Sequence, residues 1–330
     1  MITPRLYRRS LRNALQWRLL FLWWASLLLP GFVAAHPVGH YLSSQLDHST
    51  RAKDVVAWMD ASTAVDLLRH LGDAGAGEAL VMGLLGAVVA LLFLAPFMAG
   101  AMVAAARSDE PLPLHRLLAG AGEMYGRMFR TTLCGLIPVG IGAALASAAL
   151  KAAQSLASKA IWETQAQRSF RILFVVAAIV FFLFHLLVDT ARAQFVAEPA
   201  RRSALLALWS AVRLFWRQPL RVLAVGALGS AVGLGLAALA MVLRLRIDQA
   251  GIFSILIAWM LAQAAHLSIG WGRAARIFGI AELARADTAD RARSEAFRME
   301  PPASSPPPVV QSETLETLVP PSAVPLSPSK

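Results

Sequence analysis

The stretch LLGAVVALLFLAPFMAG at residues 84–100 decides the class of fold, because it contains no charged side chain. It belongs to an apolar run over about 80–106, which exceeds the roughly 20 residues that a helix needs to span the hydrocarbon core of a bilayer. Inside lipid every backbone N–H and C=O group needs a partner within the protein, and a helix provides these partners by itself. The run therefore predicts a transmembrane helix.

Five further apolar runs of similar length lie along the chain. Of its 330 residues, 57% are hydrophobic and 15% are charged, whereas about a quarter are charged in a typical soluble domain. We therefore predict an all-α fold, an integral membrane bundle of six transmembrane helices within residues 1–278, with amphipathic helices at the cytoplasmic interface. The six predicted spans cover about 17–35, 80–106, 131–150, 170–190, 219–243 and 251–272.

Lys and Arg are distributed unevenly between the two sides of such a bundle. With the N-terminus in the cytoplasm, the inner segments carry 22 of these residues and the outer segments carry 9. Basic residues are retained on the cytoplasmic side of membranes, so the count predicts a multi-pass protein of a bacterial inner membrane with both termini in the cytoplasm. The net charge of +11 then indicates contact with the bilayer through anionic lipid headgroups at the cytoplasmic Arg clusters, rather than nucleic-acid binding.

Basic amphipathic segments precede the first, third and fifth spans, at 1–18, 107–130 and 191–218. Their loose similarity predicts three helical hairpins, each preceded by an amphipathic helix. Such helices lie in the cytoplasmic interface with their apolar face toward the lipid. They either brace the bundle or offer a docking surface to a membrane-protein partner or an anionic lipid.

The two ends of the chain need separate interpretation. The first span ends in Val33-Ala34-Ala35, which is also typical of a signal-peptide cleavage site, but the nearby Pro37 disfavours cleavage, so we expect retention and keep cleavage as the alternative. Residues 279–330 predict a cytoplasmic tail. Acids and bases alternate around Ala over 279–299, which predicts a solvated helix, and Pro and Ser dominate from about 300, which predicts disorder.

A polar stripe interrupts the fourth predicted span. His185, Asp189 and Arg192 are spaced by four and three residues, so they share one face of a helix. Ionisable groups at membrane depth are costly and mark functional sites by default. Asp189 and Arg192 lie near the inner end, where they can form a structural pair, whereas His185 lies one turn deeper. Gln263 and His266 form a second stripe on the sixth span, and the two stripes would line a polar path if they faced each other.

Gly229 and Gly233 form a G-x-x-x-G pattern in the fifth predicted span. The missing side chains allow two membrane helices to approach closely. We expect this pattern to pack helices within the chain rather than to form a homodimer.

His36 and His40 are the candidate metal ligands, because a four-residue spacing places two imidazoles on one helix face. Pro37 and Gly39 argue against a helix at this place, and no thiol accompanies the two histidines. We therefore predict no metal site and no cofactor. The polar segment 36–77 instead predicts one or two short amphipathic helices that cap the bundle.

Three short segments resemble a family of uncharacterised bacterial six-helix membrane proteins. They are LDHSTRAKDVVAWMDASTAVDLL at 46–68, Asp189-Thr190-Ala191-Arg192 and Arg217-Gln218-Pro219. The chain is similar in the same way to the membrane-anchor region of some glycerophosphodiester phosphodiesterases. The resemblance covers about 1–275 and implies a fold and a membrane location, but no activity, since the metal-site residues of the phosphodiesterases are absent.

The motifs of common enzyme classes are also missing from the sequence. It contains neither H-E-x-x-H nor G-x-S-x-G, and no pair of aspartates within one span. We therefore expect a non-enzymatic accessory or scaffold protein of the membrane. The alternative is a transporter or channel, with its polar path on the fourth and sixth spans.

Overall fold

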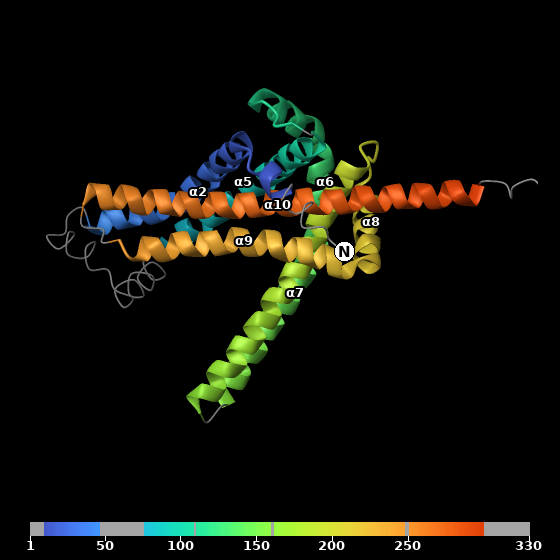
Figure 1. The fold of residues 1–330 in the computed structure, drawn as a ribbon. Helices are drawn as coiled ribbons and strands as arrows, with labels where there is room; N and C mark the ends of the chain where they lie inside the picture. Colours follow the sequence, from blue (N-terminus) through green and yellow to red (C-terminus); the bar gives the residue numbers. More distant parts are fainter. Residues whose placement is uncertain (1–9, 47–75, 109, 160–161, 248–250, 300–330) are drawn as a thin grey trace, which may run out of the picture. The chain divides into compact units, whose positions relative to one another are not determined.

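The computed structural model describes residues 10–46, 76–108, 110–159, 162–247 and 251–299, and within these ranges every regular element is a helix (Figure 1). Of the seven helices named below, six are long and apolar enough to cross a membrane, and α8 is the exception. The predicted all-α class and the six apolar helices are confirmed. The predicted separate capping helices over 36–77 are wrong for 36–46, which form the end of α2. Residues 47–75 of that segment and the predicted disorder from about 300 lie outside the described residues. The helices are α2 (Trp17–Leu46), α5 (Ala76–Arg107), α6 (Leu114–Lys159), α7 (Glu163–Ala197), α8 (Ala204–Arg217), α9 (Pro219–Leu245) and α10 (Ile252–Met299).

The chain divides into two units, Met1–Thr288 and Ala289–Lys330. The first unit holds all the helix packing described below. In the second unit the structure describes the last turns of α10, where an exposed ion pair joins Arg293 and Asp290 at 2.8 Å.

The prediction of a separate amphipathic helix over 107–130 is wrong. Apart from its first residues, the segment forms the beginning of α6, which continues without interruption through the third predicted span. Leu117, Ala121, Met124 and Met128 lie on one side of this part of α6 and are buried in the protein. These side chains belong to the hydrophobic core, so this face of the segment packs against neighbouring helices.

Pro37 does not end the first helix, so the argument against a helix around His36 and His40 is wrong. α2 runs through Pro37 and ends at Leu46. A Cβ atom on Gly83 of α5 would lie 2.6 Å from Pro37 Cγ, so the proline ring packs directly onto the glycine backbone. Close packing of this kind offsets the hydrogen bond that a proline removes from a helix.

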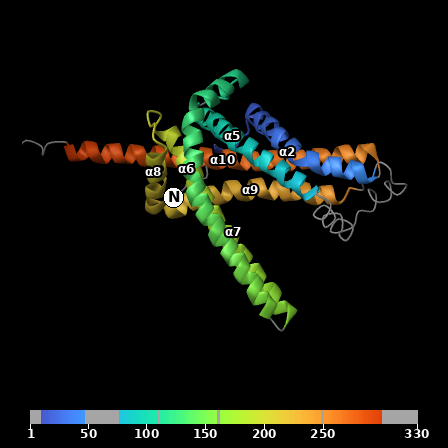
Figure 2. The ribbon, with the colours of Figure 1, turned by 180° about the vertical axis from the view of Figure 1, so that it is seen from behind.

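Glycines also bring α9 and α10 together, and the two helices run side by side in Figures 1 and 2. A Cβ atom on Gly233 would lie 2.8 Å from the carbonyl oxygen of Ser268 and 2.9 Å from Gly272 Cα. A Cβ atom on Gly229 would lie 3.2 Å from the carbonyl oxygen of Gly272. The G-x-x-x-G pattern thus lies at a crossing between two helices of the same chain.

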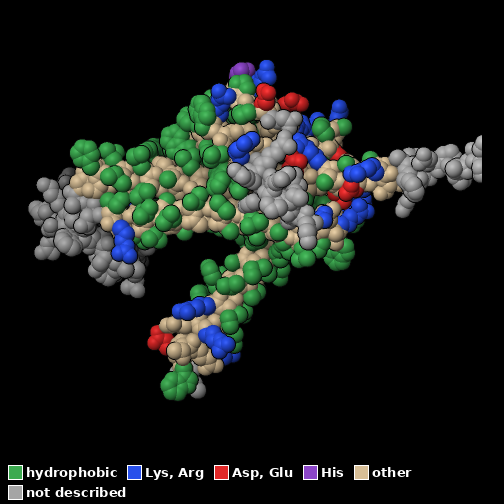
Figure 3. All heavy atoms as spheres, in the orientation of Figure 1, with side chains coloured by type: hydrophobic (Ala, Val, Ile, Leu, Met, Phe, Trp, Pro, Cys, Tyr) green, Lys and Arg blue, Asp and Glu red, His purple; other side chains and the backbone are tan. Residues whose placement is uncertain are grey.

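One hydrophobic core lies where the second half of α7 meets α5, α6, α8, α9 and α10. Residues 188–196 of α7 are buried on every side, and Leu186 packs onto Gly226 of α9. Ile280, Ala281 and Ala284 of α10 join the same core, so the first part of the segment predicted to be a solvated helix is buried instead. The outer surfaces of the helices are rich in hydrophobic side chains, and charged side chains gather near α8 and at the tip of α7 (Figure 3).

Candidate functional site

The predicted polar stripe on α7 lies in the centre of the first unit. Asp189 is 0% exposed and its neighbour Thr190 is also fully buried. The Thr190 hydroxyl donates to the carbonyl oxygen of Leu186 at 2.8 Å, which satisfies it within the helix. The carboxylate of Asp189 is therefore a buried charged group that needs partners from other side chains.

Three arginines surround this carboxylate. Arg192 Nη1 donates to Oδ1 at 2.8 Å from the same helix. Arg276 of α10 donates to Oδ2 through Nε at 3.0 Å and also through Nη2. Arg273, one turn earlier on α10, places Nη2 at 3.7 Å from Oδ1. We refer to Asp189, Arg192, Arg273 and Arg276 as the Asp189 cluster.

The guanidinium groups connect the cluster to three further helices. Arg192 Nη2 donates to the Thr132 hydroxyl of α6 at 3.3 Å, and Arg276 Nη1 donates to the Ser230 hydroxyl of α9 at 2.7 Å. The guanidinium of Arg273 lies 5.6 Å from the ring centre of Trp23 of α2, in a cation–π contact. The cluster thus joins α2, α6, α7, α9 and α10, which are five of the six apolar helices.

The chemistry of this arrangement favours a structural role. Both carboxylate oxygens already accept charged hydrogen bonds, and the group has no exposed surface. A carboxylate held in this way is not available as a general base. In the sequence, Arg273 and Arg276 contribute only to the basic residues of the predicted inner side. Their spacing of three residues at the end of an apolar run, which mirrors that of Asp189 and Arg192, was the available signal.

The other predicted polar residues, His185, Gln263 and His266, each have a different partner. His185 Nε2 lies 3.7 Å from Asp189 Oδ2, and the imidazole, 34% exposed, stacks on Phe181. On α10, Gln263 accepts a hydrogen bond from Trp24 Nε1 at 2.8 Å, and the exposed His266 is bonded to the carbonyl oxygen of Ala262 on its own helix. His185 thus belongs to the edge of the Asp189 cluster, whereas Gln263 and His266 have other partners.

His36 and His40 are exposed on one face of α2, and His36 stacks on Phe32. Within the described ranges no group of three or more His, Cys, Asp or Glu side chains lies close enough together to hold a metal ion.

The short helix α8 has two different faces. Its buried face carries small side chains together with Leu214. The opposite face carries an exposed stripe of large apolar residues, and Trp216, at 87% exposure, is its most exposed member. Three exposed arginines flank the stripe along one edge. The stripe consists of Leu205, Trp209, Val212 and Trp216, and the basic edge of Arg202, Arg213 and Arg217.

Comparison with known proteins adds no relative. No protein-family model, no curated protein and no solved structure matches the chain. The resemblance to six-helix membrane proteins stays a prediction, and the functional argument rests on the chain's own residues.

Proposed function

We propose that the chain is a non-enzymatic, multi-pass accessory or scaffold protein of a bacterial inner membrane, with both termini in the cytoplasm. α8 lies in the cytoplasmic interface, where its basic edge contacts a partner protein and anionic headgroups. The observation that carries the proposal is the two-faced α8, combined with an ionic cluster whose carboxylate is fully occupied by structural partners.

The geometry of α8 supports an interfacial position. A helix in the interface buries an apolar face at the boundary between headgroups and acyl chains, and tryptophan favours this depth. Trp209 and Trp216 supply such a face, while Arg213 on the flank can reach the headgroups and the cytoplasm. Because the remaining face of α8 is already buried in the protein, the stripe and its basic edge are the described surfaces of α8 left for contacts outside the chain, and within that edge Arg217 already lies 4.0 Å from Asp287.

Site-specific photo-crosslinking in intact membranes tests this arrangement. A photoreactive side chain replaces Arg213, Trp216 or, as the control, Phe253, which is 78% exposed at the far end of α10. We expect position 216 to form lipid adducts and position 213 to form one protein adduct of fixed mass. A complete lack of protein adducts at 213, or the same adduct at 253, would refute the scaffold function.

A transporter is the second candidate, and the partial exposure of His185 beside the buried Asp189 favours it. It requires ion- or proton-dependent flux through the purified protein in proteoliposomes. The double variant His185→Ala, His266→Ala should abolish that flux if the predicted path exists. Unchanged flux in this variant excludes the path, and flux lost in it contradicts the accessory function.

A further inference from the structure

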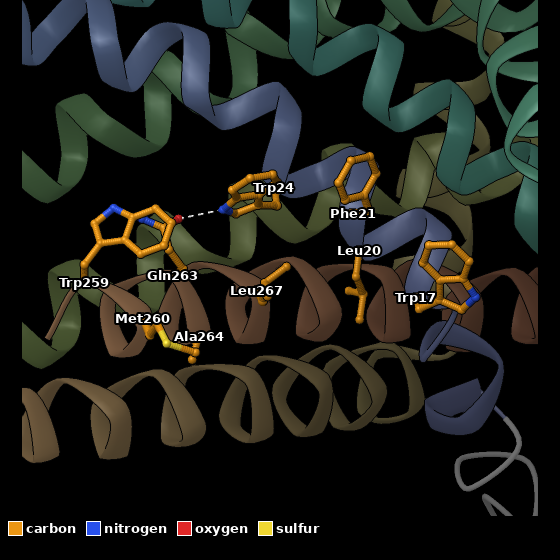
Figure 4. Close-up of a pocket in the computed structure, with 9 residues that line it drawn as sticks. All are labelled: Trp17, Leu20, Phe21, Trp24, Trp259, Met260, Gln263, Ala264 and Leu267. Carbon is orange, nitrogen blue, oxygen red and sulfur yellow. Dashed lines mark hydrogen bonds between the residues drawn. The ribbon is translucent and has the colours of Figure 1, made fainter. Parts of the chain in front are cut away.

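An apolar groove runs between α2 and α10 in the first unit (Figure 4). It has a volume of about 520 Å³, within the range of small-molecule and cofactor sites. In Figure 4, Trp17 lies at one end of the row of lining residues and Trp259 at the other. The indole N–H of Trp24 and the amide oxygen of Gln263 are bonded to each other at 2.8 Å, so this polar pair does not make the groove wall hydrophilic.

A second, more polar hollow of about 300 Å³ adjoins the groove at its Trp17 end, because Trp17 lines both. The described residues of its lining include two arginines and no acid, and the exposed Glu110 is not one of them. Asp109, which follows Ser108, lies outside the described residues. The lining residues are Arg12, Asn13, Leu15, Gln16, Trp17, Arg18, Ser108, Pro111 and Leu112.

Three side chains of this hollow are arranged to receive an anion with a polar head. Arg18 is fixed at its edge, since its guanidinium lies 5.4 Å from the Trp17 ring centre and donates to the carbonyl oxygen of Leu112 at 3.3 Å. Arg12 is exposed and takes part in none of the ion pairs among the described residues. The amide oxygen of Gln16 is buried and has no hydrogen-bond partner there. A bound hydroxyl group would satisfy it.

We infer that the two hollows together form a binding site for one anionic glycerophospholipid. Its phosphate lies between Arg12 and Arg18, a headgroup hydroxyl donates to Gln16, and one acyl chain follows the groove past Phe21 to Trp259. Charge complementarity selects an anion, and the position of a basic polar hollow next to an apolar groove, with Trp17 lining both, selects a molecule with both parts. The site is independent of the function proposed for α8, because no residue of α8 lines either hollow.

Native mass spectrometry of the full chain in a mild detergent tests the site with an equimolar mixture of palmitoyl-oleoyl phosphatidylglycerol and the matching phosphatidylethanolamine. The wild type should retain one phosphatidylglycerol in preference. The double variant Arg12→Gln, Arg18→Gln should reduce this preference about 30-fold, since each basic residue near an anionic headgroup contributes on the order of 1 kcal/mol. Arg12→Gln alone should reduce it about 5-fold and leaves the Arg18 contacts intact.

The groove is tested separately by Ala264→Trp, which fills it and should lower retention of both lipids. The matched controls are Ala178→Trp and the double variant Arg168→Gln, Arg171→Gln, which alter exposed residues of α7 and should change neither quantity. Equal losses in the arginine variants and their control would overturn the inference. Full retention in Ala264→Trp, or displacement of the lipid by millimolar glycerol 3-phosphate alone, would show a headgroup anion site without the groove and would overturn it as well.

Discussion

Replacing Asp189 by Asn should destabilise the protein more than replacing any other carboxylate described above by its amide. The substitution keeps the size of the side chain but removes its negative charge, so Arg192 and Arg276 remain buried without a counter-charge. Removing one partner of a buried ion pair costs about 3–5 kcal/mol, because the other charge is left uncompensated. Here one carboxylate serves two buried guanidinium groups, 5% and 8% exposed, so the upper half of that range applies.

The chain offers a matched control for this experiment. Asp290 pairs with Arg293 at 2.8 Å with a spacing of three residues, as Asp189 pairs with Arg192, but both of its groups are exposed. Exposed pairs of this kind contribute about 0–1 kcal/mol, so Asp290→Asn should leave the thermal midpoint almost unchanged. We expect Asp189→Asn to lower the midpoint by on the order of 10 °C when unfolding is followed by fluorescence-detected size exclusion. Equal midpoints for the two variants would refute the reasoning from burial.

Arg276→Lys should cost about 2 kcal/mol or more in unfolding free energy, because one ammonium group cannot replace three directed N–H donors. Arg273→Lys should cost less, since the guanidinium of Arg273 comes no closer than 3.7 Å to the Asp189 carboxylate. Equal shifts of the thermal midpoint in the two variants would contradict this difference. Gly233→Ala should cost about 1–3 kcal/mol, because the new methyl group would lie 2.9 Å from Gly272 Cα. Gly235→Ala, with nothing within 4 Å, should be neutral or stabilising by up to about 1 kcal/mol, and a thermal scan in which both variants behave alike would contradict the crossing. Intact mass spectrometry should give 35.4 kDa, and a value about 4 kDa lower would show that the first span is a cleaved signal peptide.

The sequence predicted the helices well and their lengths poorly, for a physical reason. A run of apolar residues reports only the part of a helix that can face lipid. α6 extends 17 residues before the predicted start at 131, because packing on other helices supports that part. Pro37 argued against a helix because the local sequence does not show which residue accommodates its ring. That residue, Gly83 of α5, is distant in sequence.

The candidate site was predicted only as far as local spacing allows. The i, i+3 relation placed Asp189 beside Arg192, and the i, i+4 relation placed His185 near Asp189. Arg276 comes from a position 87 residues away, and no periodicity within one helix predicts such a partner. The partner of Gln263 is equally distant, because its amide is bonded to Trp24 of a helix that lies 239 residues away in sequence.

The Asp189 cluster and the glycine crossing determine which apolar helices pair and in which register. Lipid tails are as apolar as leucine side chains, so apolar surface alone does not fix which helices pair or in which register. A single carboxylate bonded from α7 and α10 has one satisfied arrangement, and a shift by one residue would leave buried guanidinium groups unpaired. Gly229, Gly233 and Gly272 add a second constraint, because their backbones meet only in this register. These residues therefore hold five helices together, whereas the stripe of α8 and the groove between α2 and α10 are exposed surfaces of the described residues that take no part in this packing.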